Sequence, residues 1–127
     1  MMTTALKLAP EEVAMYRAAA RLRARQEQQA LAQREKRAWA LARQAAVLLR
    51  EEFEVERAVV FGSLVHEGCF TPWSDVDIAA WGIRPQDTFR AMGRVMDLDA
   101  EIELNLVDVG TCSDSLLMTI EQEGVAL

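Results

Sequence analysis

The stretch FGSLVHEGCFTPWSDVDIAAW, residues 61–81, decides the fold of this chain. A glycine and a serine, Gly62 and Ser63, close one apolar run, and two aspartates one residue apart, Asp75 and Asp77, open a second. Side chains on a strand alternate between the two faces of a sheet, so both aspartates project the same way while their apolar neighbours point into the core. Like charges on one face repel, and this pair therefore needs an explanation.

The surrounding sequence predicts a small α/β domain, or α+β, with a mixed sheet packed by helices. Between the first two strands, the Gly-Ser turn leads into a short helix. A final helix starts at a Ser or Asp and stops at Gly124. The expected strands are VERAVVF (55–61), VDIAAW (76–81) and AEIELNLVDV (100–109), and the expected later helices fall within 84–99 and 113–124.

A long helix precedes these elements. From Pro10 to about Phe53 the chain has no interior Gly or Pro and is rich in strong helix formers. Its length of about 60 Å, at 1.5 Å per residue, exceeds the width of a small domain. Residues 38–49 are apolar enough to pack on the body, whereas residues 21–37 are nearly all polar. We expect this polar half to project, to bend back or to pair with another subunit.

Charge divides the chain into the same parts. Residues 1–50 carry ten Lys or Arg and four Glu, a balance of +6, and residues 51–127 carry four Arg and sixteen acids, a balance of −12. We therefore expect a basic helical extension at 1–50 and an acidic domain at 51–127. The net charge of −6 argues against general nucleic-acid binding. The basic helix could meet RNA, a membrane surface or an acidic partner, or could present solvated charge only.

Other classes of protein fit poorly. A chain of 127 residues forms one core, and nothing in it approaches the roughly 18 apolar residues that a membrane span needs. The N-terminal residues lack the apolar core of a secretory signal. Cys69 and Cys112 lie far apart, without metal-ligand spacing, and are expected to be reduced thiols. We expect a cytoplasmic protein with no membrane contact.

A cation would explain the aspartate pair. Two carboxylates held close together favour a divalent ion, and hard oxygen ligands suit Mg²⁺. A Gly-Ser turn after a strand leaves backbone N–H groups free to meet phosphate oxygens. Taken separately, a DxD or a GS occurs often by chance, and an aspartate pair on an edge strand is usually solvated. The two motifs in this order and context predict a metal and nucleotide site.

These motifs resemble the signature of the minimal nucleotidyltransferases, which belong to the DNA polymerase beta superfamily. FGSLVHEGCFTPWSDVDIAAWGI is similar to the GS and DxD motifs of that family, and ELNLVDV and LLMTIEQEGVAL are similar to its third strand and closing helix. The resemblance covers roughly residues 50–127. The N-terminal arm lies outside it.

The resemblance implies an activity. Such a protein transfers a nucleoside monophosphate, often AMP from ATP, to a hydroxyl of a partner protein or small molecule. Gly62, Ser63 and Ser74 would then contribute to nucleotide binding, and Asp75 and Asp77 would bind Mg²⁺ and serve catalysis. Many members are antitoxins of a helical HEPN-type toxin. A homo-oligomer formed through the N-terminal helix is the other partner that we consider.

One position departs from the family pattern. The family supplies a third carboxylate from the third strand, and here Asn105 stands in its place. Asparagine offers a neutral oxygen and is no base, so catalysis is in question. Glu103 shares the face of Asn105, about 6.6 Å along the strand, and is the tentative substitute. Asp108 is out of phase and could serve only if the strand ends or bulges first.

Two neighbouring residues have two interpretations each. His66 could bind a phosphate or lie on the surface, and Trp73 could stack on a base or pack its loop against the sheet.

Three functions follow from the whole sequence. They are a Mg²⁺-dependent nucleotidyltransferase, a catalytically weak nucleotide-binding module that acts by binding a partner, and a scaffold that associates through the long helix.

Overall fold

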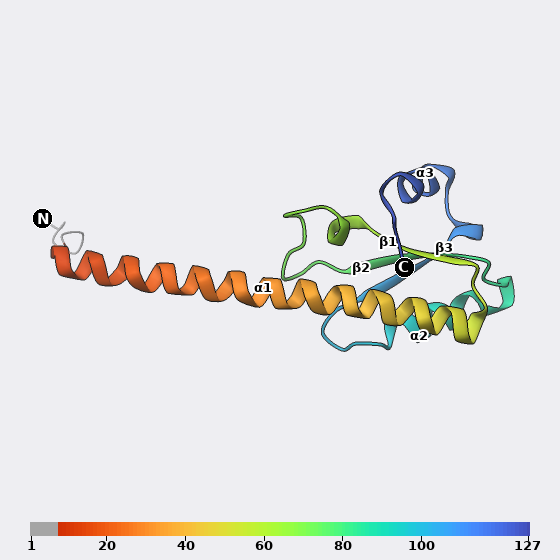
Figure 1. Cartoon of the computed structure of the whole chain (residues 1–127), viewed down its shortest axis with the longest axis horizontal. Coiled ribbons are helices and arrows are strands. Elements are labelled where there is room, and N and C mark those ends of the chain that lie inside the picture. Colours follow the sequence, from red (N-terminus) through yellow and green to blue (C-terminus); the bar gives the residue numbers. More distant parts are fainter. Residues whose placement is uncertain (1–7) are drawn as a thin grey trace, which may run out of the picture. The chain divides into compact units, whose positions relative to one another are not determined.

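The secondary structure was obtained from a computed structural model, which describes residues 8–127 (Figure 1). The predicted mixture of helices around a small mixed sheet is confirmed. Within the described residues, the α-helices are α1 (Pro10–Phe53), α2 (Thr88–Met96) and α3 (Asp114–Glu123). The strands are β1 (Arg57–Phe61), β2 (Val76–Trp81), β3 (Leu104–Asp108) and β4 (Val125–Ala126), and the 3-10 turns are η2 (Gly62–Val65), η3 (Pro85–Asp87) and η4 (Val109–Thr111).

The chain divides into two compact units, Met1–Gln33 and Arg34–Leu127, and the division falls inside α1. In the first unit, residues 10–33 are helical and nearly all of their side chains are exposed. The second unit holds the rest of α1 and every strand. No helix within residues 8–127 is long and apolar enough to cross a membrane.

The last part of α1 belongs to the core of the second unit, as its apolar sequence predicts. Its buried side chains recur every three or four residues, which places them on one face of the helix. They are Ala38, Leu41, Ala42, Ala45, Ala46, Leu48, Leu49 and Phe53. The helix ends because Glu54 adopts the left-handed conformation, with φ of 55°, and the N–H of Val55 donates back to the carbonyl of Leu49 at 3.3 Å.

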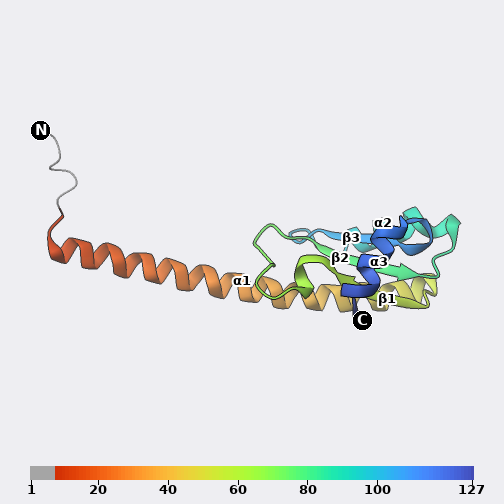
Figure 2. The same cartoon turned by 90° about the horizontal axis from the view of Figure 1, so that it is seen from above.

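The four strands form one sheet in the order β3-β2-β1-β4 (Figure 2). Strand β2 is central and pairs antiparallel with β1 and parallel with β3. Figure 1 shows α3 on one side of this sheet and α2, with the end of α1, on the other. The core under α3 contains Val59, Phe61, Ala79 and Ile120. By strand alternation, Asp77 faces the same side as Ala79.

Strand β3 is shorter than the sequence suggests. The expected strand at 100–109 begins only at Leu104, because the Asp99 carboxylate accepts hydrogen bonds from the N–H groups of Glu101 and Ile102, at 3.0 and 2.8 Å. This local turn uses backbone donors that a longer strand would need. Strand β4 has only two residues, and its short apolar run gives no usable pattern.

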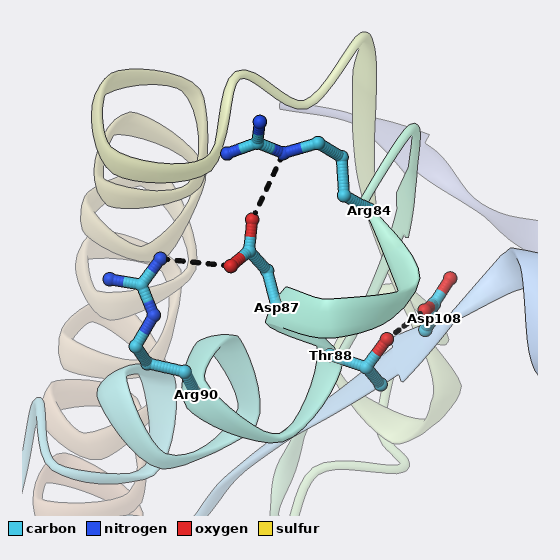
Figure 3. A network of polar contacts seen from close by, with 5 residues as sticks. All are labelled: Arg84, Asp87, Thr88, Arg90 and Asp108. Atoms are coloured by element: carbon cyan, nitrogen blue, oxygen red, sulfur yellow. Dashed lines mark hydrogen bonds and ion pairs between the residues drawn. The ribbon is translucent and has the colours of Figure 1, made fainter.

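A polar network fixes the start of α2 against the end of β3 (Figure 3). The Asp87 carboxylate accepts hydrogen bonds from Arg90 at 3.0 Å and Arg84 at 3.1 Å, and these bonds, that of Arg90 above all, lower the pKa of Asp87. Beside it, the Thr88 hydroxyl donates to the buried Asp108 carboxylate at 2.7 Å. Asp108 therefore belongs to the contact between α2 and β3.

Candidate functional site

The two aspartates lie at the start of β2, beside Asn105 on β3. Asp77 and Asn105 are directly paired in the parallel ladder, and the flanking Val76 and Ile78 are fully buried. Asp75 and Asp77 are both half-buried, and both carboxylates lie within reach of the same Asn105 amide. The alternation that the sequence predicts thus brings the pair to one face of the sheet.

The Asn105 amide offsets part of the electrostatic repulsion between the two aspartates. Its Nδ2 lies 3.3 Å from Asp75 Oδ2 and 3.5 Å from Asp77 Oδ1, so one NH₂ group donates two long hydrogen bonds. This orientation of the amide is assigned from its partners, as for any asparagine. The amide offers each carboxylate a donor, which reduces the need for a cation to hold them together.

The fold perturbs the carboxyl group of Asp77. Burial raises the pKa of Asp77, the hydrogen bond from Asn105 opposes this shift, and the charge of Asp75 adds to it. A raised pKa means that the ionised form costs free energy in the folded protein. A cation that binds beside such a carboxylate stabilises its ionised form, which is the behaviour expected of a metal ligand.

Gly62 lies directly over Asp77. Phe61 pairs with Asp77 across β1 and β2, and the next residue turns the chain with φ of +82°. A Cβ atom on Gly62 would fall 2.6 Å from Asp77 Oδ2, closer than side-chain atoms tolerate. Glycine is therefore favoured at this position for its backbone conformation, and a side chain here would displace the Asp77 carboxylate.

Replacement of Gly62 with alanine tests this geometry. We expect Gly62→Ala to lower the free energy of unfolding by about 1–3 kcal/mol, because the new methyl group clashes with Asp77 and the φ value is strained. Urea unfolding measures the change. Gly93→Ala is the control, since nothing lies within 4 Å of a Cβ at that helical glycine and the change should stabilise the protein. Equal stability of Gly62→Ala and wild type would contradict the close approach.

The other predicted residues lie in different surroundings. Ser63 follows Gly62 in η2 and is half-buried. The Ser74 hydroxyl is engaged in its own turn, where it accepts from the Thr71 N–H at 2.9 Å and shares a hydrogen bond with the Thr71 hydroxyl. Glu103 is exposed, and its backbone carbonyl accepts from the N–H of Val76 at 2.9 Å.

The oxygen atoms available for a metal are therefore few. Within residues 8–127, no group of three or more His, Cys, Asp or Glu side chains is placed to hold a metal ion. What the site offers is two carboxylates, from Asp75 and Asp77, and the amide oxygen of Asn105 after a flip of its amide. These are hard ligands of the type that Mg²⁺ takes, and the bare Gly62 leaves room beside them, so the donor set fits the ion with one charge fewer than three carboxylates provide.

Arg34 supports the segment that carries Asp75, and the sequence does not single it out. Its Nη2 donates to the carbonyl of Ser74 at 3.3 Å, and its guanidinium lies 6.0 Å from the centroid of the Phe70 ring. Its Nε is buried and has no partner among the described residues. Arg34 lies in a polar stretch of α1 with many other arginines, so no sequence signal distinguishes it.

His66 and Trp73 do not pack as core residues. His66 Nε2 lies 3.1 Å from Glu123 Oε2, which ties the end of η2 to the end of α3 at the surface. The Trp73 residue is 85% exposed, so it does not pack its loop against the sheet. That finding removes one of the two interpretations of Trp73 and leaves stacking on a ligand as a prediction.

Comparisons with known proteins place the fold but not the family. No family profile matches the chain, and no curated protein matches its sequence. Among solved structures, a chain from a crystal structure of the toxin–antitoxin complex MntA–HpeT is similar, with a TM-score of 0.56 and 18% sequence identity. The match covers 67% of this chain and 70% of that chain. That structure is of a mutant in which two aspartates, separated by one residue, are replaced by glutamate.

Proposed function

We propose that this protein is a nucleotidyltransferase that transfers AMP from ATP to a hydroxyl of a partner protein, and that it acts as the antitoxin of a toxin–antitoxin pair. The observation that carries the proposal is the meeting of Asp75, Asp77 and Asn105 on one face of the sheet under the bare Gly62 turn. The likeness of fold to a chain of a toxin–antitoxin complex supports the choice of partner. The spacing of the two aspartates replaced in that complex equals the spacing of Asp75 and Asp77.

The proposed reaction needs no covalent bond between the protein and its substrates. The acceptor oxygen bonds to the α-phosphorus of ATP, the bond from that phosphorus to the bridging oxygen breaks, and pyrophosphate leaves. The proton of the acceptor hydroxyl passes to a solvent water molecule. Asp75 and Asp77 would hold Mg²⁺, which when bound supplies positive charge to the triphosphate. The backbone N–H groups of the Gly62–Ser63 turn, together with the Ser63 hydroxyl, would bind phosphate oxygens.

Asn105 limits the rate of such a reaction. The acceptor hydroxyl must lose its proton, and a carboxamide cannot accept one near neutral pH. As the amide lies in the structure, it also donates to the two carboxylates on which the ion depends. This observation favours a second candidate function, a nucleotide-binding module that transfers slowly or not at all and acts by occupying its partner.

Labelled ATP separates the two functions. The full chain is incubated with Mg²⁺, ATP labelled at the α-phosphate, and a candidate helical partner protein. We expect label on that partner and free pyrophosphate, and we expect Asp75→Ala to remove both. Asp97→Ala, an exposed acid at the end of α2, is the matched control and should keep them. No transfer together with Mg²⁺-dependent ATP binding would support the binding module, and absence of both would refute the site.

A further inference from the structure

The first unit carries a row of exposed apolar side chains. Met15 and Leu22 lie seven residues apart in α1 and are 71% and 53% exposed. Seven residues fall only about 20° short of two helical turns, so the two side chains line one stripe, with Ala18 and Ala19 between them. Tyr16, 64% exposed, flanks the stripe. Large apolar side chains that remain exposed in a row typically mark a surface that another helix covers.

The charges beside this stripe are separated along the helix. Glu11 and Glu12 stand at its start, and Arg21, Arg23 and Arg25 stand two to four turns later. A second copy laid parallel would place acid beside acid and arginine beside arginine. A second copy laid antiparallel places each acidic end against a basic end, which is the favourable arrangement between helices.

We propose that residues 11–25 of α1 pair with the same residues of a second copy of this chain, antiparallel and centred near Ala18. In this register Met15 lies beside Leu22 of the partner subunit, and the small Ala18 and Ala19 let the two helices approach at the centre. Glu12 comes level with Arg23 of the partner subunit, and Glu11 with Arg25 of the partner subunit. The paired segment is about 22 Å long. The pairing does not depend on the proposed transfer activity, because it uses no residue of the second unit.

Solution mass tests the pairing. We expect the full chain to show, by sedimentation at high micromolar concentration, about twice its own mass of 14.2 kDa. The double variant Met15→Lys with Leu22→Lys should raise the dissociation constant by at least about 100-fold, because it puts four ammonium groups into the apolar seam. The control is Ala20→Lys with Ala24→Lys, the same charge change on the opposite face of the helix, and it should stay dimeric. A monomeric wild type, or a stripe variant as dimeric as this control, would overturn the proposal.

Disulfide trapping tests the direction. In a background with Cys69→Ser and Cys112→Ser, Ala18→Cys should cross-link to itself under mild oxidation, because residue 18 lies near the two-fold axis. Leu8→Cys should not, because it precedes the first helical residue, Pro10, whose counterpart lies about 24 Å away along an antiparallel pair. Efficient self-linking of Leu8→Cys would show a parallel pair and refute the arrangement. If the wild type is a monomer and oxidation cross-links Ala18→Cys only to another protein, the stripe binds a different partner. In that case the proposed self-pairing is wrong.

Discussion

Asp77→Asn is expected to abolish Mg²⁺-dependent nucleotide binding and to raise the melting temperature of the metal-free protein by a few degrees. The binding loss should be at least about 100-fold, since even residues that only support a metal ligand cost 10–100-fold when changed. The gain in stability follows from burial, which raises the pKa of Asp77 and makes its ionised form unfavourable. An asparagine keeps an oxygen for the Asn105 amide and carries no charge.

The pH dependence has a definite sign. Because the pKa of Asp77 is raised, the folded state holds this proton more tightly than the unfolded state does. The stability that Asp77 contributes is therefore present below its unfolded pKa and is lost as pH rises through its folded pKa. The difference in stability between Asp77→Asn and wild type should grow across that interval and stay level above it. Mg²⁺-dependent nucleotide binding by the wild type should weaken as pH falls through the same interval.

Thermal melts at several pH values, with and without Mg²⁺ and ATP, measure both effects. Asp97→Asn, the same chemical change at an exposed acid, is the control and should leave nucleotide binding unchanged. An Asp77→Asn variant that keeps the wild-type nucleotide affinity would remove Asp77 from the site. A variant less stable than wild type at neutral pH would contradict the cost assigned to its charge.

Asn105→Asp is expected to make the stability of the folded protein depend on Mg²⁺. Without metal, a third carboxylate replaces an amide that donates to Asp75 and Asp77, and we expect a loss of about 1–3 kcal/mol in the free energy of unfolding. With Mg²⁺, the three carboxylates form a complete set of hard ligands. Mg²⁺ affinity should then rise at least about tenfold, and the rate of any nucleotide transfer should rise with it.

The shift of melting temperature on addition of Mg²⁺ is the direct measurement, and label transfer from ATP is the second. Asn105→Ala is the matched control, because it removes the amide donor without adding charge; it should lose stability and gain no response to Mg²⁺. A melting temperature of Asn105→Asp that ignores Mg²⁺ would show that position 105 does not reach the ion. A fall in transfer rate would mean that the asparagine is already suited to the reaction.

Much of the local structure could be predicted from the sequence because it depends on residues that are close together in the chain. The absence of Gly and Pro predicted α1 to its end at Phe53, and VDIAAW forms strand β2 at its predicted bounds. The last helix has the expected cap, with Ser113 Oγ accepting from the N–H of Leu116 at 3.2 Å. The fold class followed from the order of these elements.

Other features escaped prediction because they depend on side-chain contacts that the sequence pattern does not fix. The late start of the third predicted strand follows from the Asp99 side chain, which accepts hydrogen bonds from the backbone two and three residues further on, and an aspartate need not form this local turn. The bond between Thr88 and Asp108 requires α2 to lie against the end of β3. The bond from Arg34 to the carbonyl of Ser74 spans 40 residues.

The sequence by itself determined that Asp75 and Asp77 share a face, because a strand alternates its side chains with a period of two wherever it lies. It also determined that a glycine precedes Ser63. Only the tertiary structure decided that the Asn105 amide lies against both carboxylates and that Gly62 lies over Asp77, because both depend on the register in which three strands pair. Register is set by packing across the whole sheet, which no single stretch of the chain encodes.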